Sequence, residues 1–243
     1  ALAAVTQSIG LVATQNTTYN DPIELAHRLQ SLDVLSGGRA AWNVVTTDNA
    51  WTGANFRRGG YLDHDDRYTH AADVIAIAQR SWDSNGEPFR YATKYYDVAG
   101  SGQLERSAQG HPVLFQAGDS PEGRDFAAAH AEVIFSAHGT FDAAKAFAED
   151  IRARTIAAGR PADDLKIFPG QAFIIADTLA EAEEKERWVR EHQITPQTAI
   201  AFVEALWGTD LSAYDPDGPL PDIDPVVAET GETRGAGFRA AKS

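Results

Sequence analysis

Residues 9–45, IGLVATQNTTYNDPIELAHRLQSLDVLSGGRAAWNVV, decide the fold class of this chain. Residues 9–14 and residues 40–45 are short apolar runs, which predict two buried strands. Between them, Asp21-Pro22 opens a helix, because proline at an early helical position loses no hydrogen bond, and Gly37-Gly38 ends it. The apolar stripe of this helix consists of Leu25, Leu29 and Leu32. A strand, a helix and a strand in this order predict two parallel strands.

The same alternation of short apolar runs and longer helical patterns continues to about residue 192. Strand–helix alternation predicts a parallel sheet, and repeated units in one direction favour a closed barrel over an open sheet. We therefore expect an α/β protein with the (β/α)8 TIM-barrel fold. The further predicted strands are residues 112–116, 132–136 and part of 165–176. The further predicted helices are residues 65–82, a helix that begins at Ser120, residues 141–158 and residues 178–192.

The barrel is expected to form a single domain over residues 1–243 and to be incomplete. About five of the eight strand–helix units of a full barrel are recognisable, so the missing ones are expected before residue 1 and after about residue 194. Methionine is absent, an initiator included, which also predicts an incomplete N-terminus. Two stretches interrupt the alternation: an insertion at residues 85–109, with a short aromatic strand around residues 95–98, and an extended loop and tail at residues 209–243.

The composition excludes several classes of function. A net charge of −14 repels phosphate backbones and anionic membrane surfaces, so nucleic acid and membrane are not expected as partners. Cysteine is absent, which excludes disulfides and thiolate metal sites and fits a reducing cytoplasm. No apolar run is long enough for a membrane span, and no signal peptide is recognisable. These features predict a cytoplasmic globular protein.

Polar residues follow the predicted strands, where parallel barrels carry their sites. Thr14 ends the first strand, and Asn43 and Thr46 lie at the end of the second. After the third strand, Gly118 and Ser120 lead into a helix N-terminus, which can hold a phosphate. The alternative for Ser120 is a plain helix N-cap.

The segment HDDRY, residues 64–68, is the densest polar cluster. His64 and Tyr68 are four residues apart, so they share a face if a helix starts here, and both could then contact a ligand at the barrel mouth. The alternative is a capped helix start with an exposed histidine. His70 lies within a helix and is expected to be solvated, whereas His138 follows a strand and is expected near the mouth. No metal-ligand spacing, P-loop, nucleophilic serine elbow or dinucleotide fingerprint is present.

Four segments in order resemble one enzyme family. Residues 32–39, LDVLSGGR, resemble the signature of bacterial-luciferase-like barrels. WNVVTT at residues 42–47 and HDDRY at residues 64–68 are similar to the branch of nitrilotriacetate, EDTA and dibenzothiophene-sulfone monooxygenases. QAGDS at residues 116–120, with the Gly123-Arg124 that follows, completes the resemblance, which runs from about residue 1 to about residue 225.

The resemblance implies a flavin-dependent monooxygenase of the two-component type. Such a barrel binds reduced FMN (FMNH2), which a separate NAD(P)H-dependent flavin reductase supplies, and oxygenates a small organic substrate with O2. The flavin contacts would be Thr14, His64, Tyr68 and Ser120 with its helix N-terminus and Gly118, with Asn43 and Thr46 in second rank. The resemblance also suggests a homodimer or homotetramer. It assigns no catalytic acid or base and does not name the substrate.

Two alternatives stay open beside this hypothesis. A deazaflavin-dependent oxidoreductase would share the fold, although the Asn-Val-Val-Thr and His-Asp-x-Arg-Tyr segments favour the FMN branch. A non-catalytic flavin- or ligand-binding barrel would also share it, since barrels host many functions. Substrate loss coupled to NADH consumption, with an added flavin reductase, would separate these hypotheses.

Overall fold

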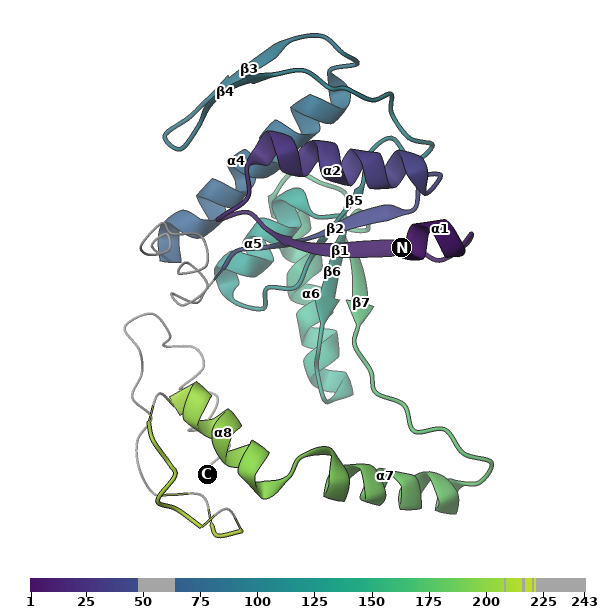
Figure 1. Ribbon diagram of the computed structural model, residues 1–243, viewed down its shortest axis with the longest axis vertical. Coiled ribbons are helices and arrows are strands. Elements are labelled where there is room, and N and C mark those ends of the chain that lie inside the picture. Colours follow the sequence, from purple (N-terminus) through teal and green to yellow (C-terminus); the bar gives the residue numbers. More distant parts are fainter. Residues whose placement is uncertain (48–63, 208, 216, 220, 222–243) are drawn as a thin grey trace. The chain divides into compact units, whose positions relative to one another are not determined.

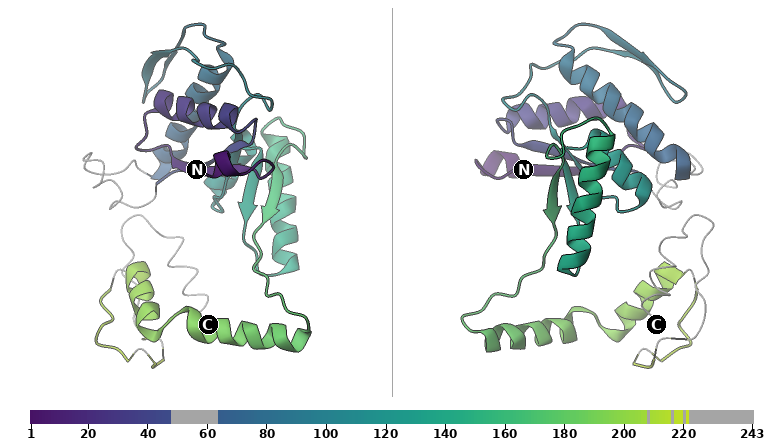
Figure 2. Two further views of the ribbon diagram at one scale, coloured as in Figure 1. Left: turned by 45° about the vertical axis from the view of Figure 1, so that its right-hand side comes forward. Right: turned by 180° about the vertical axis from the view of Figure 1, so that it is seen from behind.

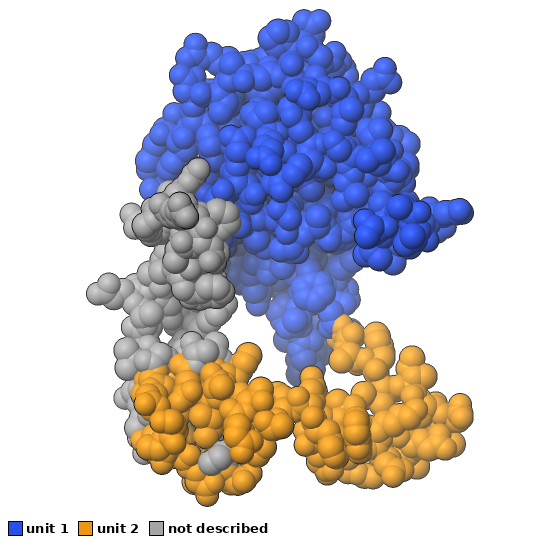
Figure 3. All heavy atoms as spheres, in the orientation of Figure 1, with its two compact units in different colours: residues 1–170 blue, residues 171–243 orange. Residues whose placement is uncertain are grey.

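The structure is a computed structural model that describes residues 1–47, 64–207, 209–215, 217–219 and 221, without the side chains of residues 64, 65, 205 and 206. The chain divides into two compact units, Ala1–Gly170 and Gln171–Ser243. Figure 3 colours them blue and orange. The single barrel domain expected over residues 1–243 stays a prediction.

The first unit is built on a five-stranded parallel sheet with the strand order β1-β2-β5-β6-β7 (Figure 1). The five strands predicted for this sheet are all present. The order follows the chain, as expected when each strand is followed by a helix that returns to the next parallel strand. The strands are β1 (Leu11–Asn16), β2 (Ala40–Val45), β5 (Val113–Gln116), β6 (Val133–Ser136) and β7 (Lys166–Pro169).

Four helices cover one face of this sheet, as the views in Figures 1 and 2 show. They are α2 (Pro22–Leu35), α4 (His64–Asp83), α5 (Pro121–His130) and α6 (Phe141–Ala157). The predicted start of α2 is confirmed, because the Asp21 carboxylate accepts a hydrogen bond from the Glu24 N–H at 2.9 Å and Pro22 is the first helical residue. The main core packs α2, α4 and α5 on the sheet around the fully buried rings of Trp42 and Trp82. A second cluster packs α5 and α6 on β6.

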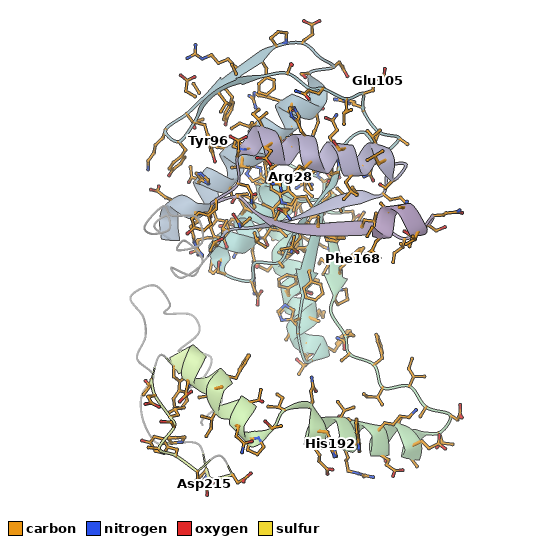
Figure 4. The ribbon with its side chains drawn as sticks, in the orientation of Figure 1. Arg28, Tyr96, Glu105, Phe168, His192 and Asp215 are labelled. Atoms are coloured by element: carbon orange, nitrogen blue, oxygen red, sulfur yellow. The ribbon has the colours of Figure 1, made fainter. Side chains whose placement is uncertain are left out.

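The opposite face of the sheet is exposed within the first unit. Side chains alternate along each strand, so the residues next to the buried ones face this side. Val12, Phe135 and Phe168 are among them, with 49%, 49% and 52% exposure; Phe168 is labelled in Figure 4. This is the face that lines the interior of a barrel, and it carries Thr14 and Asn43.

The turn between α2 and β2 holds the amino end of β2 in a dense hydrogen-bond network. The Asp33 side chain is fully buried, and its carboxylate accepts hydrogen bonds from the Ala40 N–H at 2.9 Å, from Gln109 Nε2 at 2.6 Å and from the Ser107 hydroxyl. Arg39 donates to several main-chain carbonyl groups, those of Ala3, Thr6, Ile9 and Ser36. Gly37 and Gly38 have φ angles of 72° and 80°, which disfavour side chains other than hydrogen.

The predicted insertion differs from the expectation in one respect. Residues 89–100 form an antiparallel hairpin of β3 (Phe89–Ala92) and β4 (Asp97–Gly100). Strand β4 overlaps the strand predicted around residues 95–98, whereas β3 was not predicted. Tyr95 and Tyr96 lie at its turn, and the hairpin packs on α4. The Asp73 carboxylate of α4 accepts hydrogen bonds from the Tyr91 hydroxyl at 2.9 Å and from the Thr93 hydroxyl at 2.6 Å. The alternation of strands and helices does not predict β3, because β3 pairs with β4 in a separate two-stranded sheet.

Three further helices complete the described chain. A short helix α1 (Leu2–Val5) precedes β1. In the second unit, α7 (Leu179–Gln193) begins at a capping box of Thr178 and Glu181, close to its predicted start. A helix α8 (Pro196–Trp207) follows, which the sequence pattern had not predicted. None of the described helices combines the length and the apolar character needed to cross a membrane.

Candidate active site

The first two strands bring Thr14 and Asn43 together. The two residues are partners in the β1–β2 register, and Asn43 Nδ2 donates a hydrogen bond to Thr14 Oγ1 at 3.2 Å. Thr14 is exposed and Asn43 is half-buried. Their neighbours Ala13 and Trp42 face the helices instead. The alternation of the strands therefore presents a hydroxyl and an amide on the barrel-interior face, near the carboxyl end of the sheet.

The loops that leave β1 and β2 are joined beside this pair. The Thr17 N–H donates to the Val45 carbonyl at 3.0 Å, and the Thr47 N–H contacts Thr18 Oγ1 at 3.4 Å. Thr46 lies half-buried at this junction. The structure places it at the predicted edge, but no hydrogen bond ties it to the other candidate side chains that are described.

Tyr68 lies against the first turn of α5. Its ring packs on Phe126, with 5.4 Å between ring centroids. A Cβ atom added to Gly123 would lie only 2.9 Å from the Tyr68 hydroxyl. The first part of α4 and the start of α5 therefore meet at Tyr68. A shared flavin contact of Tyr68 and Ser120 stays a prediction.

The turn of Gly118 and Ser120 is packed without room for larger side chains. A Cβ atom on Gly118 would lie 2.9 Å from Gln116 Nε2 and 3.1 Å from the Cα atom of Gly123. Gln116 is buried, and its Oε1 accepts a hydrogen bond from the Gly118 N–H. The sequence analysis quoted Gln116 as part of the QAGDS segment but did not name it as a site residue, because a glutamine at a strand end does not indicate a contact with the following turn.

Ser120 is the N-cap of α5. Its hydroxyl oxygen accepts a hydrogen bond from the Gly123 N–H at 3.2 Å, and its carbonyl accepts one from the Arg124 N–H at 2.9 Å. The plain N-cap role considered above is thus present. It does not exclude a ligand, because a hydroxyl that accepts one hydrogen bond can still donate its own proton. The positive end of the helix dipole also lies here.

A charged network braces this helix start. Arg124 donates to Asp119 Oδ1 at 2.7 Å and to Asp150 Oδ2 at 2.9 Å, and Arg154 binds both Asp150 and Asp125. Burial opposes charge on Arg124, but the hydrogen bonds to Asp150 and Asp119 prevail and raise its pKa. Burial likewise works to raise the pKa of Asp150, and the hydrogen bonds from Arg124 and Arg154 overcome it and lower that pKa. Arg124 and Asp150 are therefore both charged near neutral pH.

The predicted histidines have different outcomes. His64 is the first residue of α4, and its side chain lies outside the described residues, so its contact with a ligand stays a prediction. The His138 ring packs on Phe147 in a tilted arrangement, with 4.6 Å between ring centroids, and its Nε2 atom is buried. His70 was expected to be solvated, and that was wrong: it is 8% exposed, and its Nε2 atom lies 2.8 Å from the Tyr96 hydroxyl. The aromatic turn of the hairpin covers it, a tertiary contact that helical periodicity does not predict.

The described site is rich in neutral donors and poor in acids and bases. Its described candidates offer hydroxyls, one amide and a helix N-terminus, which are groups that bind and orient a polar ligand. Within the described residues, no group of three or more His, Asp or Glu side chains is arranged to hold a metal ion. The arrangement therefore suits a ligand that brings its own reactivity and carries a phosphate.

Comparison with known proteins defines the family. The model of the luciferase-like monooxygenase family matches residues 1–225, and the chain belongs to this family. The fold is accordingly of the α/β TIM-barrel type. A solved structure of riboflavin lyase with modified FMN and the substrate riboflavin superposes with a TM-score of 0.81 at 34% identity, covering 98% of this chain and 56% of that one.

Two curated relatives are similar over most of this chain. Nitrilotriacetate monooxygenase component A of Aminobacter aminovorans is 38% identical over 91% of the chain. Dibenzothiophene-sulfone monooxygenase of Rhodococcus erythropolis is 34% identical, also over 91% of it. In both cases the match covers 53% of the relative, so the chain spans about half the length of these proteins.

Proposed function

We propose that this chain belongs to an FMNH2-dependent monooxygenase of the two-component type, which oxygenates a small organic substrate with O2. The observation that supports this most is the junction of Tyr68 with the Gly118–Ser120 turn, in a chain of the luciferase-like monooxygenase family. An α-helix N-terminus capped by a serine and packed on two glycines fits a phosphate group. The residues present therefore fit FMN.

In this proposal each candidate residue has a binding role. The Ser120 hydroxyl and the N-terminus of α5 hold the flavin phosphate, and Gly118 allows the close approach of the main chain. Tyr68 and His64 contact the flavin from α4, and Thr14 and Asn43 contact it from the sheet, with Thr46 beside them. Reduced FMN bound there supplies the electrons with which O2 is activated. The protein orients the substrate and excludes water.

The proposal includes two partners that reach the site from solution. One is a separate NAD(P)H-dependent flavin reductase, because the sequence has no dinucleotide fingerprint of its own. The other is the organic substrate, whose identity the described residues do not specify. We further propose a homodimer or homotetramer, as the resemblance implies, and a cytoplasmic location, which the absence of cysteine favours.

The test is a reconstitution with the full chain. The purified protein is expected to be colourless and inactive with NAD(P)H alone, because the contacts to oxidised flavin are few and each contributes roughly 0.5–3 kcal/mol. Addition of a flavin reductase, FMN and a candidate substrate should produce an oxygenated product. Reduced-flavin binding without turnover of any organic substrate would indicate a non-catalytic barrel. Turnover with a deazaflavin but not with FMN would indicate the other branch of the fold.

A further inference from the structure

Arg124 lies at the start of α5, where an arginine could be taken for the cation that binds the flavin phosphate. Its guanidinium group is instead engaged by the protein. Arg124 Nε donates to the Asp119 carbonyl at 3.0 Å and to Asp119 Oδ1 at 3.1 Å, and Nη2 donates to the same Oδ1 at 2.7 Å. Nη1 donates to Asp150 Oδ2 at 2.9 Å. The guanidinium carbon also lies 4.9 Å from the ring centroid of Phe147.

These contacts fix the turn that precedes α5. One guanidinium group holds both the main-chain carbonyl and the carboxylate of Asp119, the residue between Gly118 and Ser120. A planar, bidentate hold of this kind restrains orientation as well as distance. The main chain of Gly118 lies close to that of Gly123, and the Tyr68 hydroxyl lies close to Gly123 as well. If the contacts of Arg124 with Asp119 were lost, the turn could not move towards α5 without a steric clash.

The same contacts neutralise the negative charge of the Asp119 carboxylate in this turn. Asp119 is 65% exposed and stands beside the helix N-terminus, where an unpaired carboxylate would repel an anion. The Arg124 side chain is only 24% exposed and is kept charged by its two carboxylate partners. Asp150 is shared with Arg154, so Arg124 is left to neutralise Asp119.

We propose that Arg124 is a positioning residue for phosphate binding, which acts through Asp119 by orienting the Gly118–Ser120 turn and neutralising its carboxylate. This inference rests on the proposed function for the identity of the ligand as FMN. It concerns a residue that touches the turn and assigns it no contact with the reacting atoms.

The test measures phosphate binding by the full chain and its variants in two ways. The rise of the thermal unfolding midpoint with the concentration of inorganic phosphate gives the phosphate affinity. Anaerobic titrations give the affinities for reduced FMN and reduced riboflavin. Arg124→Gln is expected to weaken phosphate and reduced FMN about tenfold, the equivalent of one charge-assisted hydrogen bond, and to leave reduced riboflavin unchanged. Arg124→Lys should recover part of the loss, since lysine restores the charge but not the bidentate hold.

The double variant distinguishes indirect from direct action. In an Asp119→Asn background, Arg124→Gln should cost much less than in the unmodified chain, because no carboxylate is left to neutralise. An equal cost in both backgrounds would mean that Arg124 contacts the phosphate itself and would overturn the proposal. Equal losses of reduced FMN and reduced riboflavin would overturn it too, since they indicate a general loss of structure.

Asp150→Asn is the matched control for folding. It removes the other carboxylate partner of Arg124 and leaves the turn intact, so phosphate affinity should stay within about twofold of the unmodified chain. A loss as large as that of Arg124→Gln would contradict the proposal. Phosphate binding that depends on Arg124 in a chain that binds no flavin would refute the proposed function and support this inference. Absence of phosphate binding by the unmodified chain would refute the inference.

Discussion

The two ends of the parallel sheet use polar residues in opposite ways. At the amino end of β2, the buried Asp33 carboxylate accepts three hydrogen bonds and Arg39 binds a series of main-chain carbonyls. At the carboxyl end, the exposed Thr14 hydroxyl has one described partner, Asn43. Ser120 caps α5 at its N-terminus, which is the positive end of the helix dipole. At the amino end, the polar side chains form their hydrogen bonds within the protein. At the carboxyl end, hydroxyl and amide groups can still donate hydrogen bonds to a ligand.

The contrast indicates which part of the family signature performs which task. The LDVLSGGR segment is the broad signature of the family, yet its polar side chains tie the chain to itself. In barrels, residues at the amino face contribute to stability and residues at the carboxyl face contribute to function. We therefore expect substitutions at the two ends to separate stability from flavin binding.

The largest effect is expected for Asp33→Ala at the amino end. The change leaves the buried Ala40 N–H without its acceptor and removes one of the two acceptors of Gln109 Nε2, which should lower the free energy of unfolding by roughly 3 kcal/mol. Urea denaturation measures the loss. Flavin affinity, measured below the unfolding transition, should be unchanged. A variant of native stability would show that the amino-end network is dispensable.

Gly123 at the carboxyl end of the sheet and Gly38 at the amino end allow the same substitution, glycine to alanine, to be compared at both ends. Alanine at Gly123 would place a Cβ atom 2.9 Å from the Tyr68 hydroxyl and 3.0 Å from the Cα atom of Gly118. We expect reduced-FMN affinity to fall about tenfold or more, the equivalent of at least about 1.4 kcal/mol. The close contacts should also lower the free energy of unfolding by about 1–2 kcal/mol, and the helix preference of alanine over glycine offsets only part of this loss. Anaerobic titration and thermal unfolding of the same sample check both parts.

Gly38→Ala is the counterpart at the amino end. Its φ angle of 80° and a contact of 3.3 Å with the Ala108 Cβ atom oppose a side chain, so unfolding free energy should fall by about 1–2 kcal/mol. Reduced-FMN affinity should not change. If both glycine variants lose stability and affinity in the same ratio, the two ends are not separable.

A smaller effect is expected for Tyr68→Phe. The ring contact with Phe126 is retained, and only the hydroxyl at the start of α5 is removed. Loss of one hydrogen bond to a ligand corresponds to about 1 kcal/mol, or roughly fivefold in reduced-FMN affinity. Unchanged affinity and unchanged turnover would show that flavin binding does not use the hydroxyl.

The smallest effect concerns the face of α4 that carries the hairpin. Burial lowers the pKa of His70 from its ordinary value of 6.5, against the opposing charge of Asp73. The unfolded chain therefore binds a proton at higher pH than the folded chain. Stability should be constant above about pH 6.5 and fall as the pH drops towards the folded-state pKa, by at most about 1.4 kcal/mol per pH unit.

His70→Gln is the control for this pH dependence. Urea denaturation between pH 5 and pH 8 should give a flatter profile for the variant than for the unmodified chain. Identical profiles would mean that His70 titrates alike in both states, in conflict with its burial under Tyr96.

The sequence predicted the sheet, and the positions of several candidate residues on it, because the signals for both are local. Strand alternation, the Asp21 cap and the Ser120 cap depend on neighbours within a few residues. Residues Thr14, Asn43 and Ser120 could be placed at one edge because the carboxyl ends of parallel strands lie together. The side chain of His64 and the closure of the barrel stay predictions.

The features that were missed depend on contacts distant in sequence. Burial of His70 results from Tyr96 on the hairpin, and the buried role of Asp33 results from Ser107 and Gln109 beyond it. Arg124 was quoted only as part of the resemblance, since its partner Asp150 lies on the next helix. Periodicity and capping rules describe single elements and do not indicate which elements meet.

Two flavins that differ only in the phosphate test directly whether the start of α5 binds a phosphate. Reduced FMN and reduced riboflavin are titrated anaerobically into the full chain and into Ser120→Asp. We predict that the unmodified chain binds reduced FMN about tenfold or more tightly than reduced riboflavin, and that the added carboxylate removes this preference by repulsion. Equal affinities of the unmodified chain for the two flavins, or a preference that survives Ser120→Asp, would contradict a phosphate site at the start of α5.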